Sequence, residues 1–189
     1  MFESSENTSF LFGEIMDLYH EKGFTLPELV VTFTVAIILL SLAAPSMKSM
    51  LADRRIVMAT EQIYKSIVLT RSEAVKRGLF VSLCRATNAS QCAGSGEDWA
   101  SGWIIFTDEN RNGNIDDADQ IIRVQPVLSS SISIIWNRGR YLRFNSRGMA
   151  IDAGTFTLCG TITDGDAMRT VSISVTGRAR VAELESCDG

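Results

Sequence analysis

The chain has 189 residues and a formal net charge of −4, with 46% hydrophobic residues and a single histidine, His20. Five acidic residues stand against Lys22 alone within residues 1–23, so the rest carries seventeen acidic and seventeen basic residues. Partners must therefore be sought in local patches of charge rather than in the overall balance. Residues 24–189 contain no imidazole, which excludes Ser–His and Cys–His catalysis and histidine-ligated zinc there. We do not expect an enzyme.

The first long apolar segment reads KGFTLPELVVTFTVAIILLSLAAP, residues 22–45. From Phe24 to Ala44 the sole charged residue is Glu28. A helix of this length rises about 31 Å, close to the bilayer core of about 30 Å. We therefore predict that residues 24–51 form the membrane-spanning or filament-core half of a long helix. A carboxylate in a bilayer core costs roughly 2.5 kcal/mol or more, so the position of Glu28 requires an explanation.

The residues around Gly23 explain why a carboxylate stands at position 28. KGFTLPEL resembles the processing site of type IV prepilins and pseudopilins, where a dedicated peptidase cuts after the glycine. The resemblance implies that residues 1–23 are a leader, that the mature chain begins at an N-methylated Phe24, and that Glu28 neutralises the N-terminal amine of a neighbouring subunit. Pro27 departs from the family pattern, but proline is tolerated in a first helical turn. The alternative is a plain single-span anchor with its glutamate near the interface.

Past Pro45 the apolar residues recur at steps of three, four, four and seven, as one helix face requires: Ile56, Ala59, Ile63, Ile67 and Ala74. Gly78 is a helix stop signal. Short β-rich runs follow: LFVSLC, GWIIFT, QIIRVQPV, SISIIW, YLRFNS, TFTLCG and RTVSISVT. WNRGRY and TDGDAMRT are predicted hairpin turns. The pattern predicts an α+β fold, a helix packed on antiparallel sheet, with residues 52–189 as the globular head.

The four cysteines are Cys84, Cys92, Cys159 and Cys187, and none forms a CxxC pair. An even number of cysteines behind a membrane-inserting segment suggests disulfides in an oxidising compartment, and four cysteines allow three pairings. We favour Cys84–Cys92, which closes a short polar loop, and Cys159–Cys187, which attaches the C-terminal tail to a strand. Chain entropy gives these bonds roughly 2.5 and 3.5 kcal/mol. The alternative is four buried thiols.

Three further strings resemble one branch of the pilin superfamily: LTRSEAVKRG at residues 69–78, WASGWIIFTDENRNG at 99–113 and LRFNSRG at 142–148. Together they are similar to the GspH/FimT branch of minor pilins and pseudopilins, and the likeness extends from Lys22 nearly to the C-terminus. It implies a type IV pilin-like fold. Two systems use this branch, the type IV pilus and the type II secretion pseudopilus.

The segment DENRNGNIDDAD is a candidate calcium site. Its oxygen-bearing residues occupy positions one, three, five, nine and twelve of an EF-hand-like loop, with Gly113 at position six: Asp108, Asn110, Asn112, Asp116 and Asp119. Against calcium, the flanks read as strands rather than helices, and position twelve has Asp instead of Glu. The alternative is an Asx-rich loop that satisfies its own backbone.

The segment TGRARV, residues 176–181, is a candidate DNA-binding site. Arg178 and Arg180 alternate in a strand-like run, so both project to one face, and Gly177 lets the backbone approach a phosphate. Arg138 and Arg140 are expected as auxiliary contacts. Gly-Arg-x-Arg resembles the C-terminal DNA-binding motif of FimT pilins. The alternatives are a solvated basic edge or a strand that contacts another subunit.

The resemblance thus implies a minor pilin of the type IV pilus that binds double-stranded DNA during uptake in natural transformation. The alternatives are a type II secretion minor pseudopilin H, or a FimU-like structural or priming pilin without DNA binding. Expected partners are other pilins, prepilin peptidase and the inner membrane before assembly. The head would lie in the periplasm, and the assembled protein in an extracellular pilus or periplasmic pseudopilus. No cofactor is expected apart from calcium.

Overall fold

The computed structural model describes residues 23–94, 98–128, 130–160 and 167–184, excepting the side chains of 42–49, 52 and 167. The chain divides into two units, Met1–Pro45 and Ser46–Gly189. One helix, α1 (Leu26–Arg77), begins in the first unit and ends in the second.

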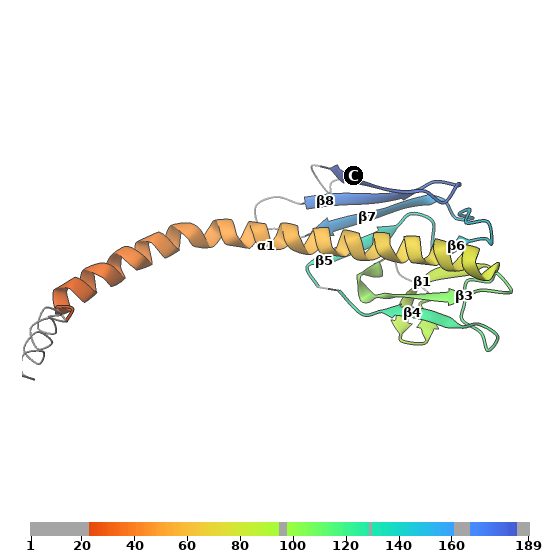
Figure 1. The fold of residues 1–189 in the computed structure, drawn as a ribbon, viewed down its shortest axis with the longest axis horizontal. Coiled ribbons are helices and arrows are strands. Elements are labelled where there is room, and N and C mark those ends of the chain that lie inside the picture. Colours follow the sequence, from red (N-terminus) through yellow and green to blue (C-terminus); the bar gives the residue numbers. More distant parts are fainter. Residues whose placement is uncertain (1–22, 95–97, 129, 161–166, 185–189) are drawn as a thin grey trace, which may run out of the picture. The chain divides into compact units, whose positions relative to one another are not determined.

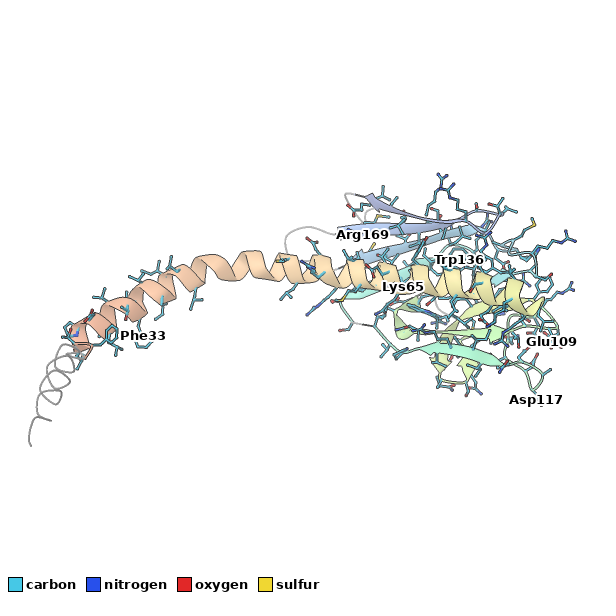
Figure 2. The ribbon with its side chains drawn as sticks, in the orientation of Figure 1. Phe33, Lys65, Glu109, Asp117, Trp136 and Arg169 are labelled. Carbon is cyan, nitrogen blue, oxygen red and sulfur yellow. A yellow bond between two sulfur atoms is a disulfide. The ribbon has the colours of Figure 1, made fainter. Side chains whose placement is uncertain are left out.

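In the first unit the helix begins with Pro27 in its first turn, where its missing N–H breaks no intrahelical bond. The exposed large apolar side chains here include Phe24, Leu26, Val30, Phe33, Ile37 and Leu40; Phe33 is labelled in Figure 2. Thr34 Oγ1 donates back to the carbonyl of Val30 at 2.7 Å, which satisfies a polar group on an apolar surface. Within the described residues, no helix has both the length and the hydropathy of a membrane span. The division into residues 1–23, 24–51 and 52–189 stays a prediction.

In the second unit the predicted apolar face of α1 is buried. Each of its members is at most 3% exposed: Ile56, Ala59, Ile63, Ile67 and Ala74. Polar groups on this face are satisfied, since the buried Thr60 and Thr70 hydroxyls donate to carbonyls four residues earlier. Ser66 Oγ accepts from Trp103 Nε1 at 2.9 Å, which connects the helix to the sheet. The helix stops at Gly78, whose φ of +68° suits glycine.

Two antiparallel sheets lie beside this half of the helix (Figure 1). The five-stranded sheet runs β2 (Gln91–Cys92), β1 (Val81–Asn88), β3 (Trp103–Thr107) and β4 (Ile121–Gln125), and β6 (Tyr141–Phe144) also pairs with β1. The four-stranded sheet runs β5 (Ile132–Trp136), β7 (Gly154–Gly160), β8 (Ala167–Ile173) and β9 (Ala179–Leu184). The predicted α+β class is confirmed.

The WNRGRY segment does not form the expected hairpin. Trp136 ends β5 in the four-stranded sheet, whereas Tyr141 begins β6, which pairs with β1 in the other sheet. The chain therefore crosses between sheets at residues 137–140. Turn residues correctly marked a boundary between two strands, but which strands pair depends on the burial of whole faces. The TDGDAMRT turn lies largely outside the described residues, although β7 and β8, which flank it, do pair antiparallel.

The main core is built from α1 and both sheets. Its largest fully buried members include Trp99, from the short helix η1 (Trp99–Ser101), together with Trp103, Phe144 and Phe156. The Trp99 and Phe156 rings meet edge to face at 5.0 Å, and Trp136 stacks on Phe156 at 4.3 Å. Such aromatic pairs add about 0.5–1.5 kcal/mol to their burial.

A second apolar cluster lies on the opposite face of the five-stranded sheet. Side chains alternate along β3, so Ile104 and Phe106 face away from the main core that contains Trp103 and Ile105. Ile115, from the loop that joins β3 to β4, packs on this cluster. Burial of Ile115 positions that loop over the outer face of the sheet.

Candidate functional site

The predicted processing and assembly residues lie at the start of the first unit. Gly23 and Phe24 precede α1, and Glu28 is the acidic residue of its first turn. A carboxylate there also interacts favourably with the positive end of the helix dipole. Most of the predicted leader, residues 1–22, lies outside the described residues. Cleavage after Gly23 and the assembly role of Glu28 stay predictions.

The predicted Cys84–Cys92 disulfide is present and joins β1 to β2. Cys84 belongs to the second apolar cluster and Cys92 packs against it, so this bond links β2, at the edge of the sheet, to a small core. Cys159, in β7, is also disulfide-bonded. Its predicted partner, Cys187, lies outside the described residues.

Three of the predicted DNA-binding arginines line one surface hollow of about 680 Å³, which we call the arginine hollow: Arg138, Arg178 and Arg180. Arg138 comes from the β5–β6 crossing, and the other two come from the β8–β9 hairpin. Hydroxyl side chains, including those of Thr155 and Ser172, form much of the remaining lining. Among the described residues that line the hollow there is no aspartate or glutamate.

Local structure fixes Arg138 in this hollow. Arg138 Nε donates to the carbonyl of Ala153 at 2.9 Å. A Cβ added at Gly154 would approach Arg138 Cγ to 2.6 Å and Asn137 Oδ1 to 2.5 Å, so only glycine leaves room for the arginine stem. Sequence reasoning missed Gly154, although a glycine at the start of a β-rich run signals close approach of another segment.

Three other arginines of residues 138–180 form contacts outside the arginine hollow. Arg143 forms a two-point ion pair with Asp152, at 2.8 and 3.0 Å, and the hydrogen bond to Asp152 raises the pKa of Arg143. Arg169, labelled in Figure 2, pairs with Glu183. Arg140, a predicted auxiliary contact, is not part of the hollow's lining; its Nη1 donates to the carbonyl of Gly94 at 3.2 Å.

Gly177 has a packing role that its sequence context did not indicate. It is buried with φ +78°, and an added Cβ would collide with the carbonyl oxygen of Gly148. Arg71 Nε donates to that same carbonyl at 3.0 Å. Gly177 therefore allows the β8–β9 hairpin to pack on the turn at residues 145–148, beside the helix. Its predicted approach to a phosphate stays a prediction.

The candidate calcium loop, residues 108–119, joins β3 to β4. Glu109 and Asp117, both exposed, are labelled there in Figure 2. Asp108 is fully buried, and its Oδ2 accepts from Ser82 Oγ at 2.5 Å and from Gly113 N at 3.1 Å. The amides of Asn110 and Asn112 both donate to Asp116 Oδ2. Asp119 accepts from the backbone N–H groups of Glu109 and Asp116.

Comparison with known proteins identifies the family. The sequence model described as type II transport protein GspH matches residues 59–177, more than half of the chain. The chain belongs to the GspH family. A comparison with curated proteins finds no significant match.

Two solved structures of one minor pilin show the same fold for this GspH-family chain. Two crystal forms of the type IV minor pilin FimU of Pseudomonas aeruginosa strain PAO1 are similar, with TM-scores of 0.55 and 0.51 and identities of 21% and 22%. The matches cover 72% and 69% of this chain and 97% and 98% of FimU. The minor pseudopilin EpsH from the type 2 secretion system of Vibrio cholerae has a TM-score of 0.48 and 13% identity, with 68% of this chain and 97% of EpsH covered.

Membership of the GspH family gives the coarse function. The chain is a GspH/FimT-like minor pilin or pseudopilin with the type IV pilin-like fold, a kind of protein that associates with other pilins in a filament. The family match includes the loop at residues 108–119 and Arg138 but ends one residue before Arg178. The arginine hollow thus combines residues from within and beyond the matched region.

Proposed function

We propose that this GspH-family chain is a minor pilin of the type IV pilus and that its head binds double-stranded DNA at the arginine hollow during DNA uptake. The observation that carries the proposal is the gathering of Arg138, Arg178 and Arg180 around one hollow whose described lining has no acidic side chain. The mature chain predicted here is neutral overall, so attraction to DNA would depend on such a local excess of charge.

The chemistry of the three side chains suits phosphate. Each guanidinium is planar and presents several donors, which match phosphate oxygens in two-point hydrogen bonds. Arg178 and Arg180 are exposed, and within the described residues neither forms an ion pair, so neither must break a bond before binding. Hydroxyl groups such as those of Thr155 and Ser172 can also donate to phosphate oxygens.

Contacts of this kind recognise the sugar–phosphate backbone of DNA rather than its bases. We therefore expect binding to be largely independent of sequence and to weaken as salt rises. For about three neutralised phosphates, the slope of log K against log salt concentration is about −2.7. Loss of two of the three arginines would reduce the slope to about −1.

A second candidate is a structural or pseudopilin role without DNA binding. The observation that favours it is the exposed apolar surface on the same hairpin and strand, where Val175, Val181 and Leu184 are 59%, 44% and 51% exposed. A neighbouring subunit could cover such side chains, and the arginines would then rim a protein interface. Gene neighbourhood separates a type IV pilin from a pseudopilin, since pilus-assembly or competence genes favour the pilus and a secretion operon favours type II secretion.

The test is a titration of the full chain, in detergent, into fluorescently labelled duplex DNA at two salt concentrations. Arg178→Gln/Arg180→Gln should abolish most of the salt-sensitive binding. The matched control is Arg54→Gln/Arg123→Gln, which removes two exposed arginines outside the hollow and should bind like wild type. Equal binding by the two double variants, or no salt-sensitive binding by wild type, would leave the structural role as the function.

A further inference from the structure

The β3–β4 loop contains a buried carboxylate oxygen that has no hydrogen-bond partner among the described residues. Asp108 is 0% exposed, and both hydrogen bonds to its carboxylate are accepted by Oδ2. Oδ1 is buried and, within the described part of the chain, accepts no hydrogen bond. A buried polar atom of this kind costs roughly 1–3 kcal/mol, and more when it is charged. Native structures rarely retain such an atom without an ion, a water or a functional reason.

The same carboxylate is directed into the loop. Gly113 N donates to Asp108 Oδ2 at 3.1 Å, so the residue at position one is bonded to the glycine at position six. Gly113 has φ +72°, the left-handed conformation of a sharp turn. A Cβ at Gly113 would also run into the ring of Tyr141, so the turn is closed against the sheet.

The remaining oxygen-bearing side chains converge within the loop. Asn110 Nδ2 and Asn112 Nδ2 donate to Asp116 Oδ2 at 2.6 and 2.8 Å, which brings positions three, five and nine together. Their Oδ1 atoms accept from backbone N–H groups two residues ahead, and an amide oxygen retains a second lone pair for a cation. Ile115, at position eight, packs on the second apolar cluster, which fixes the loop to the sheet.

We propose that residues 108–119 bind one Ca²⁺. Asp108 Oδ1, the side-chain oxygens of Asn110, Asn112, Asp116 and Asp119, and the main-chain carbonyl at position seven would be its ligands. Calcium takes six to eight oxygen ligands in flexible geometry and accepts amide and carbonyl oxygens beside carboxylates. Among the described residues no three His, Cys, Asp or Glu side chains, Asp108, Asp116 and Asp119 included, already lie close enough together to hold a metal ion. The three carboxylates must therefore move toward one another when the ion binds. Binding requires the two amide nitrogens to turn away from Asp116.

The ligand set also predicts the strength and selectivity of binding. Position twelve carries Asp119, whose short carboxylate provides weaker closure than the two-oxygen Glu of EF-hand loops. We expect a Kd of about 10⁻⁴ M, the range of extracellular modules. Magnesium should bind more weakly, because it demands near-ideal octahedral geometry.

The experiment is isothermal titration calorimetry of the full chain in detergent, stripped with EDTA, against CaCl₂ and separately MgCl₂. Wild type should bind one Ca²⁺ saturably. Asp116→Asn should weaken binding at least about tenfold, since affinity follows the number of charged ligands. Asp117→Asn removes the same charge from the neighbouring exposed position, which is not a ligand position, and should leave the affinity within about threefold.

Thermal unfolding separates loss of the ligand from loss of the fold. In EDTA, wild type and Asp116→Asn should unfold at similar temperatures, and CaCl₂ should raise Tm for wild type only. If Asp116→Asn is unfolded in EDTA, Asp119→Asn replaces it in the same comparison. The proposal would be overturned if calorimetry of wild type showed no saturable heat of calcium binding. It would also be overturned if Asp116→Asn bound calcium as tightly as wild type, or if Asp117→Asn lost as much calcium affinity as Asp116→Asn.

Discussion

At the scale of single residues, one main-chain carbonyl joins three segments that are distant in sequence. The carbonyl of Gly148 accepts from Arg71 Nε, and Gly177 packs against it. Each residue belongs to a different string that pointed to the family or to DNA, namely LTRSEAVKRG, LRFNSRG and TGRARV. The hairpin that carries Arg178 is therefore positioned by contacts that have nothing to do with a ligand.

Gly177→Ala tests this packing. Gly139 supplies the matched control, because its φ is +97° but no atom lies within 4 Å of an added Cβ. Gly139→Ala should cost about 1 kcal/mol, from the left-handed backbone alone. Gly177→Ala adds a collision with the Gly148 carbonyl and should cost about 3 kcal/mol in the free energy of unfolding. Urea denaturation of the two variants measures the difference, and equal costs would show that the hairpin can move away from the turn.

At the scale of elements, the end of α1 is connected to the start of β4 by charge-assisted hydrogen bonds. Arg77 Nε donates to Glu73 Oε2 at 2.6 Å, and Arg77 Nη1 donates to Gln120 Oε1 at 2.5 Å. The hydrogen bond from Arg77 lowers the pKa of Glu73 below its ordinary value of 4.5. Stabilisation from a carboxyl with a lowered pKa is complete above its unfolded pKa and disappears as the pH falls through the folded pKa.

Glu73→Gln should therefore lower the urea midpoint at neutral pH, and the difference from wild type should shrink as the pH falls below 4.5, the ordinary pKa of this carboxyl. Glu61→Gln is the control on the same helix. Glu61 pairs with Lys65 at 2.7 Å and its pKa is also lowered, but both side chains are more than half exposed and both belong to α1. Its effect should be smaller and should fall further in salt. A Glu73→Gln difference that persists unchanged into acid would show that the packing of Glu73, rather than its charge, matters.

Helices and strands with a regular spacing of apolar residues were predictable from the sequence, but which strands pair with one another was not. The face formed by Ile56, Ile63 and Ile67 is buried as its spacing predicted, and each of the seven predicted β-rich runs contains a strand. The crossing at WNRGRY was missed, because local turn signals do not specify which sheet the next strand joins. The arginine hollow was predictable only in part. Alternation along the strand predicted that Arg178 and Arg180 lie on one face. The role of Gly154, which leaves room for the Arg138 side chain, depends on a contact that the sequence does not show.

At the scale of the whole molecule, the chain combines a head of the type IV pilin-like fold with a helix whose first turn carries a single carboxylate. The family match begins at residue 59, so it does not include Gly23, Phe24 or Glu28. For these residues the prediction depends on KGFTLPEL and on a physical argument. A carboxylate among apolar side chains becomes favourable when a positive group meets it, and the amine of a processed N-terminus is such a group.

Glu28→Ala separates processing from assembly. In cells with active prepilin peptidase, mass spectrometry should find N-methylated Phe24 at the start of both wild type and variant, because the cut lies before the altered residue. The variant should nevertheless be depleted from sheared filaments, since the amine of a neighbouring Phe24 loses its counter-charge on entering an apolar filament core. Glu61→Ala removes a carboxylate from the exposed side of the same helix and should assemble like wild type. An intact leader on wild type would contradict the cleavage site. Normal assembly of Glu28→Ala would instead show that Glu28 is an interfacial anchor residue, with no partner in the filament.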